Sequence, residues 1–517
     1  MTEQVLATRS RAAGVPRGVL ACVCASTLVV MGLVAAVNVA VPALAAGPLH
    51  PSASQLLWVV DGHVVVFACL VIPGGALGDR LGRKGVLVAG LVGVAVGAAV
   101  TAAAPSTGVL LGGRILTGAS AALVLPNCLG VLVHATEGPA RLRAIALWGA
   151  VSGMGGVVGN TVGGALLLPG SWRLLFVAVV PMALACAAWT ALVVTRTGRS
   201  DRRLDPVGTL LIVVVTVALL GGIVEGPERG WTSALVGSLL ASAAVSLVVW
   251  VLVELRVEHP LIDPRLFRLA GVSAAGLGLV VLFFGSFGLF FLNASLLQYV
   301  HDFSTLGTGL AILPLAVPLL LLSRVMPTLL PRVGLVAALS VSFVAVSAGL
   351  LGLAATVESS YAVYALWLAV VGIGFAFGLP ALTVELNTSM PAGQAGAAGG
   401  LQSALRELGS ALGVAVVGSV LTASLADRLG AVGGVPPSAR TVAAALDAAP
   451  TQRAEVVHAF ARSCASGLWV GAAVTAASGA LVVATILRSG RRSQRHGGDD
   501  GVAGVRAPVP AGAGDQA

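Results

Sequence analysis

The chain has 517 residues, of which 57% are hydrophobic and only 10% are charged. Soluble domains carry about a quarter charged residues, so the composition excludes an ordinary soluble protein and indicates a polytopic membrane protein. The net charge of +9 does not indicate a nucleic-acid partner, because most Lys and Arg residues fall in short segments between apolar runs.

Apolar runs of about 20 residues, bounded by charge, Pro or Gly, predict fourteen transmembrane helices and therefore an all-α membrane protein. The predicted spans are 18–45, 56–77, 85–104, 108–133, 144–168, 172–195, 207–225, 233–253, 271–297, 305–323, 333–357, 361–383, 402–425 and 464–487. An even number of spans places both termini on one side, which carries nearly all the loop cations. The short loops of the other side that lack Lys and Arg are 47–55, 105–107, 298–304 and 358–360. By the positive-inside rule we expect both termini in the cytoplasm.

An internal repeat predicts two related halves. Residues 75–82 after the second span match 327–334 after the tenth, and 118–126 match 372–380 at nearly the same offset. Two six-helix halves with spans seven and eight inserted between them would explain this pattern. The predicted parts are a cytoplasmic tail 1–17, an N-terminal half 18–195, an inserted segment 196–270, a C-terminal half 271–488 with an outside loop 426–463, and a disordered cytoplasmic tail 489–517.

Three motifs carry a resemblance to a known family. The segment Gly75-x-Leu-Gly-Asp79-Arg80-x-Gly82-Arg83-Lys84 resembles the signature loop between helices two and three of the major facilitator superfamily. Arg114-Ile-Leu-Thr-Gly118 resembles that superfamily's fourth-helix motif. The glycines of the fifth span resemble its antiporter motif, and they are Gly155, Gly159, Gly163 and Gly164.

With Trp58-Val-Val-Asp61 before these motifs and fourteen spans, the chain resembles the fourteen-spanner drug/proton antiporters, which include exporters of quaternary ammonium compounds. We expect a monomer in the bacterial cytoplasmic membrane. The resemblance implies that the two halves rock about a central site, and that inward proton flow drives export of an amphipathic, cationic small molecule. Two residues depart from the family pattern: Leu33 stands where an aspartate is common, and Asn160 stands where a proline is usual.

Asp61 is the leading candidate for coupling protons to substrate. It lies about 8 Å inside the second span, where an ionised carboxylate is costly and should face a cavity or a partner. A carboxylate of this kind accepts either a proton or a cation, and loading one expels the other. Arg114 lies at nearly the same depth and is always charged, so we expect it to pair with or position a carboxylate. His63 lies nearly opposite Asp61 on the helix, and we expect it at the membrane interface.

Glu407 opens the thirteenth span beside Arg406, and adjacent residues on a helix do not share a face. We expect Glu407 either to titrate during transport or to stabilise the helix N-terminus. The resemblance implies that Asp79, with its neighbouring cations, latches the cytoplasmic ends of the helices. The glycines of the fifth span recur every four residues, so we expect them to let a neighbouring helix approach closely.

The sequence leaves other functions open. The absence of an acid at Leu33 makes transport of a neutral or anionic metabolite, or of a self-made antibiotic, a credible alternative. A membrane sensor or scaffold that does not transport is the alternative from another class. No ATP-binding loop, intramembrane catalytic motif or metal-ligand spacing occurs in the sequence, so we expect neither an enzyme nor a cofactor.

Overall fold

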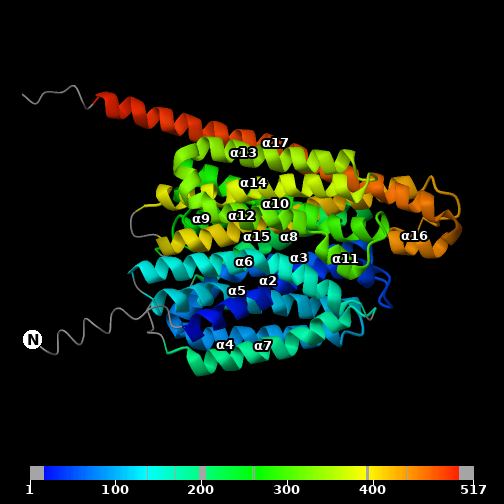
Figure 1. Cartoon of the computed structure of the whole chain (residues 1–517), viewed down its shortest axis with the longest axis horizontal. Coiled ribbons are helices and arrows are strands. Elements are labelled where there is room, and N and C mark those ends of the chain that lie inside the picture. The colour runs from blue at the N-terminus through cyan, green and yellow to red at the C-terminus, as the bar shows by residue number, and fades with distance from the viewer. Residues whose placement is uncertain are drawn as a thin grey trace, which may run out of the picture.

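The computed structural model describes residues 17–136, 138–168, 170–196, 205–258, 260, 262–391, 395–437 and 439–499. These residues form a bundle of long helices (Figure 1). Thirteen helices within them are long and apolar enough to cross a membrane. A further long helix occupies the position of the predicted fifth span.

Among the described residues, six helices form the N-terminal half. They are α2 (Arg17–Ala45), α3 (Ala53–Leu81), α4 (Arg83–Ala102), α5 (Thr107–His134), α6 (Gly138–Leu166) and α7 (Arg173–Val193). Helix α5 packs against α3 and α4, and α2 packs against α6. This half lies at the bottom of Figure 1, in blue and cyan.

The inserted helices and the C-terminal half follow. The helices are α8 (Pro206–Arg229), α9 (Ala234–Glu254), η1 (Pro264–Arg268), α10 (Ala270–Tyr299), α11 (Thr305–Leu310), α12 (Leu313–Val333), α13 (Leu335–Ala355), α14 (Tyr361–Ser389), α15 (Ala395–Leu429), α16 (Val442–Ala448), η2 (Pro450–Gln452) and α17 (Arg453–Asp499). Helix α10 packs against α15 and α17, and α14 packs against α12 and α13. Helix α16 lies beyond the end of the bundle, at the right of Figure 1.

Helix α8 joins the two halves along one side. The Oγ of Ser419 on α15 donates to the carbonyl of Ile223 on α8 over 2.8 Å. On α3 the thiol of Cys69 lies 3.9 Å from the carbonyl of Ile212, and the ring of Trp58 lies beside Gly221. Helix α8 therefore covers the contact between α3 and α15, whereas α9 packs mainly against α8.

Three helix boundaries differ from the sequence prediction. The segment predicted as a loop from Gly75 is helical to Leu81, and only Gly82, with φ of 102°, turns the chain into α4. The tenth span is divided into α11 and α12 just before Pro314, which lacks the N–H that a continuous helix requires. Helix α17 continues to Asp499, past the start of the predicted disordered tail.

The halves also meet close to the predicted outer end of the bundle, where α2 ends and α11 begins. A Cβ on Gly164 of α6 would overlap the backbone of Thr305, and one on Gly309 of α11 would overlap the carbonyl of Asn160. Gln298 on α10 donates to the carbonyl of Val39 on α2 over 3.3 Å. Small residues and one cross-half hydrogen bond thus hold this end closed.

Candidate functional site

Asp61 lies on the face of α3 that meets α15. Leu57, four residues before it, would contact a Cβ on Gly418 of α15, and Ile72, eleven residues after it, lies against Gly400. Helix positions separated by four or eleven residues share one face. Asp61 therefore lies in the seam between the N-terminal and C-terminal halves, and its side chain is fully buried.

Glu407 lies on the matching face of α15. It follows Gly400 by seven residues and precedes Gly418 by eleven, so it shares the face that these glycines present to α3. Its exposed fraction is 8%. The neighbouring Arg406 points elsewhere, with its guanidinium 4.6 Å from the ring centroid of Phe283 on α10.

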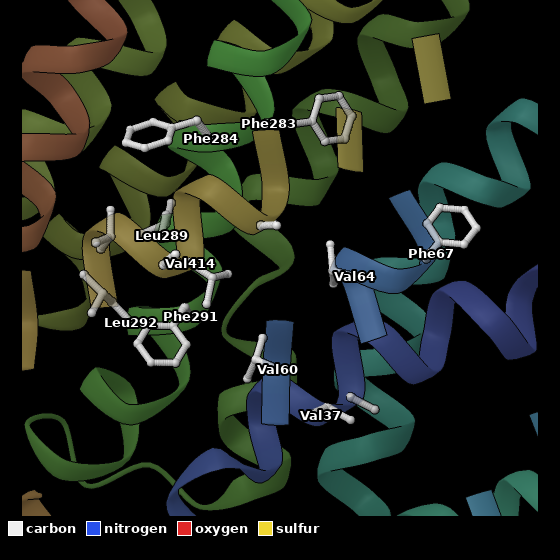
Figure 2. Close-up of a cluster of buried hydrophobic side chains, with 14 of the residues drawn as sticks. Val37, Val60, Val64, Phe67, Phe283, Phe284, Leu289, Phe291, Leu292 and Val414 are labelled. Carbon is white, nitrogen blue, oxygen red and sulfur yellow. The ribbon is translucent and has the colours of Figure 1, made fainter. Parts of the chain in front are cut away.

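The two carboxylates thus come from opposite halves and share one seam. The Leu57–Gly418 and Ile72–Gly400 contacts make α3 and α15 antiparallel. At about 1.5 Å per residue they place Asp61 and Glu407 about 6 to 10 Å apart along the helix axes. Figure 2 shows Val60 and Val64 of α3 across from Val414 of α15, so apolar side chains of both halves face each other in this seam.

The predicted pairing of Arg114 with Asp61 is not formed. The Nε of Arg114 donates to the carbonyl of Val59 over 2.8 Å, and an Nη approaches that of Val60 at 3.5 Å. Within the described residues neither carboxylate oxygen of Asp61 has a hydrogen-bond partner. Two backbone carbonyls of α3 thus accept from Nε and one Nη of the guanidinium, whereas Nη1 is buried and has no hydrogen-bond partner among the described residues.

The prediction that His63 lies at the membrane interface is wrong. His63 is 1% exposed, and its Nδ1 lies 3.0 Å from the Oγ1 of Thr117 on α5. Thr117 in turn donates to the carbonyl of Arg114 over 2.8 Å. His63 does face away from Asp61, but that side of α3 is covered by α5 rather than by lipid.

The signature segment contains an internal ion pair between Asp79 and Arg83. Arg83 also approaches the carbonyl of Pro126 on α5 at 3.5 Å, and it occupies the space that a Cβ on Gly130 would need. The N-terminus of α15 is one of the helix ends that Asp79 is expected to latch, and its first turn includes side chains that lie outside the described residues. Arg83 therefore ties the junction of α3 and α4 to α5.

The glycines of the antiporter motif serve two neighbours. Gly155, Gly159 and Gly163 lie against Met31, Gly32 and Ala36 of α2, respectively. Gly164 instead lies against Thr305 at the start of α11, in the other half. One stripe of α6 therefore packs against α2 within its own half, and Gly164 contacts α11 of the other half.

Comparison with known families agrees with this architecture. The sequence profile of the Major Facilitator Superfamily matches residues 23–414. The chain is a member of the Major Facilitator Superfamily. It is a multi-pass protein of the bacterial inner membrane, and it is a transporter rather than an enzyme.

Relatives from other bacteria are resistance proteins. The multidrug resistance protein Stp of Mycobacterium tuberculosis is 33% identical over 72% of this chain and 70% of its own. The tetracenomycin C resistance and export protein of Streptomyces glaucescens is 30% identical over 73% of this chain and 71% of its own. The methyl viologen resistance protein SmvA of Salmonella typhimurium is 32% identical over 75% of this chain and 79% of its own. These likenesses support efflux as the direction of transport.

A solved structure shares the fold. A bacterial homologue of the human lysosomal transporter Spinster, in an inward-facing and unoccupied conformation, has a TM-score of 0.63. The likeness covers 91% of this chain and 97% of the other at 17% identity. It shows the superfamily fold alone.

Proposed function

We propose that this superfamily member is a proton-coupled exporter of amphipathic, cationic compounds, with Asp61 as the group that exchanges a proton for the substrate. The supporting observation is a fully buried carboxylate, in the seam between the halves, without a hydrogen-bond partner among the described residues. An ionised carboxylate at the centre of a span costs about 2.5 to 3.5 kcal/mol. A bound proton or a bound cation removes that cost, and the two cannot occupy the carboxylate together.

Glu407 extends this proposal to a second proton position. It faces the same seam from α15, so rocking of the halves changes its surroundings together with those of Asp61. Arg114 acts through the α3 backbone, because its bonds to Val59 and Val60 fix the turn of α3 that carries Asp61. Arg114 is therefore a positioning residue.

Asp79 has a proposed role as a conformational latch. In this state its carboxylate pairs with Arg83, one turn further along the chain. When the cytoplasmic ends of the halves approach, the N-terminus of α15 offers the carboxylate a second, partly positive partner. A shift of the Asp79 carboxylate from Arg83 to the N-terminus of α15 would stabilise the state in which the inner end is closed.

The proposal is tested in inside-out vesicles that hold an imposed pH gradient. Addition of ethidium should dissipate the gradient in the wild type, and Asp61→Asn should abolish this response at equal expression. Asp79→Asn should slow the response without lowering the amount of folded protein. A wild type that expresses well but responds to no cation would exclude cation–proton exchange.

Export of a neutral compound or a self-made antibiotic is the second candidate. Leu33 leaves the first span without the acid that the cation exporters commonly carry, and one relative exports tetracenomycin C. A sensor or scaffold would give no substrate-dependent flux with any compound, so the same vesicles separate the three functions.

A further inference from the structure

A small cavity lies between the halves near the predicted outer end. Its lining comes from α2 and α6 of one half and from α10, α11 and the residue before α12 of the other, and consists of Val39, Asn160, Phe290, Asn293, Ala294, Thr308 and Ile312. In the closed state it has room for about one water molecule. None of its lining residues is charged, so it differs chemically from the seam that contains Asp61 and Glu407.

Hydrogen bonds outside the cavity fix how the two carboxamides face it. The hydroxyl of Tyr364 donates to Oδ1 of Asn293 over 2.9 Å, which leaves the Asn293 NH2 group for the cavity. The NH2 of Asn160 donates to the carbonyl of Gly156 over 2.9 Å, which leaves the Asn160 Oδ1 for the cavity. The hydroxyl of Thr308 donates to Ser304 and keeps acceptor capacity. The cavity therefore offers one donor and two acceptors.

The Asn160 side chain is not needed for the contact between the halves. Gly309 of α11 packs against the backbone carbonyl of Asn160 and the Cα of Thr161. Truncation of the Asn160 side chain would leave that contact in place. Its polar group is thus available for a ligand rather than committed to packing.

We propose that Asn160, Asn293 and Thr308 bind uncharged hydrogen-bonding groups of a transported compound, separately from the proton-exchanging carboxylates. The inference rests on the proposed export function and adds a second substrate class to the cations: neutral molecules with hydroxyl and carbonyl groups beside an apolar or aromatic body. Because the cavity walls belong to opposite halves, movement of the halves enlarges it. Phe290, which stacks edge-on with Phe287 at 5.4 Å, supplies an aromatic wall.

The test measures uptake into inside-out vesicles of two neutral probes, chloramphenicol and tetracenomycin C, and of one cation, ethidium. Asn160→Ala and Asn293→Ala should each slow uptake of the neutral probes about fivefold, the effect of one lost hydrogen bond. Ethidium uptake should change by less than about twofold. Asp61→Asn should abolish coupled uptake of all three probes.

Two control variants separate binding from packing. Ser152→Ala removes a hydroxyl bonded to the Trp148 carbonyl on the same helix, outside the cavity, and should leave uptake of every probe unchanged. Tyr364→Phe removes the hydrogen bond to Asn293 but keeps the NH2 group of Asn293. It should slow uptake of the neutral probes less than Asn293→Ala does.

Equal slowing of ethidium and the neutral probes by the Asn variants would overturn the proposal and indicate a gate. Uptake of ethidium without uptake of either neutral probe would also overturn it while leaving cation export intact. If the wild type takes up none of the three compounds, the export function itself fails.

Discussion

Two aspartates of the N-terminal half differ in their burial and in their partners. Asp79 is partly exposed and forms an ion pair with Arg83, so its charge is compensated in this state. Asp61 is fully buried, and its oxygens have no partner among the described residues. A buried polar group without a partner lowers stability, and such groups persist where function requires them.

Asp61→Asn should therefore stabilise the folded protein while abolishing coupled transport. The carboxamide carries no charge, so it avoids the cost of an ionised carboxylate inside a span, which is about 2.5 to 3.5 kcal/mol at the span centre. Thermal unfolding of the purified protein should show a higher Tm for this variant than for the wild type. The matched control Asp79→Asn loses an ion pair and should not raise Tm. A lower Tm for Asp61→Asn would mean that the carboxylate has a stabilising partner.

Single residues could be predicted from the sequence only where their chemistry is rare. Asp61, Arg114 and Glu407 are identifiable because charges seldom occur inside apolar runs. The pairing of His63 with Thr117, and the convergence of Asn160 with Asn293, could not be predicted, because both cross between helices and neutral polar residues are common in such spans.

Helix α6 shows how one element can serve two neighbours. Gly159 lies so close to Gly32 of α2 that a Cβ would overlap the backbone, whereas a Cβ on Gly156 would meet nothing within 4 Å. The next turn presents Asn160 and Gly164 to α11. Packing within the half and contact across the seam therefore depend on different faces of the same helix.

Gly159→Ala should weaken the α2–α6 contact by about 1 to 3 kcal/mol, the usual range for an overpacked site. The control Gly156→Ala should be neutral or stabilising, because alanine favours helix formation and space is available. The Tm and the rate of vesicle uptake should both be lower for Gly159→Ala than for the wild type, and neither should be lower for Gly156→Ala. Equal behaviour of the two variants would show that close approach at Gly159 does not matter.

The positions of the membrane-spanning helices could largely be predicted from hydropathy, but the ends of some helices could not. Gly75 and Gly78 suggested a loop, yet they lie within α3. A Cβ on either residue would contact a side chain of α5, which explains glycine there without a turn. The division of the tenth span before Pro314 also escaped the hydropathy pattern, because no charged residue separates the two pieces.

The whole molecule is closed at its predicted outer end by contacts between halves, and α8 connects α3 with α15 along one side. Rocking of the halves must break the outer contacts but not those within each half. The ion pair between Arg453 and Asp302, with an N–O distance of 2.8 Å, lies entirely within the C-terminal half.

Cross-linking tests this difference in a variant without native cysteines. The first pair is Val39→Cys with Gln298→Cys. A short bifunctional reagent that forms a disulfide with each thiol should join these two cysteines, hold the halves together and stop transport. Asp302→Cys with Arg453→Cys should cross-link equally well without stopping transport. Release of the linker by reductant should restore activity of the first pair. Continued transport with the first pair fully cross-linked would contradict rocking at this seam.

The most direct measurement of proton exchange at Asp61 is proton release from the purified protein in weakly buffered detergent solution when ethidium is added. Binding is followed in the same sample by ethidium fluorescence. If Asp61 exchanges a proton for the cation, the wild type releases protons as ethidium binds, and Asp61→Asn releases fewer or none at equal occupancy. Equal proton release by both proteins, or binding to the wild type without release, would contradict proton exchange at Asp61.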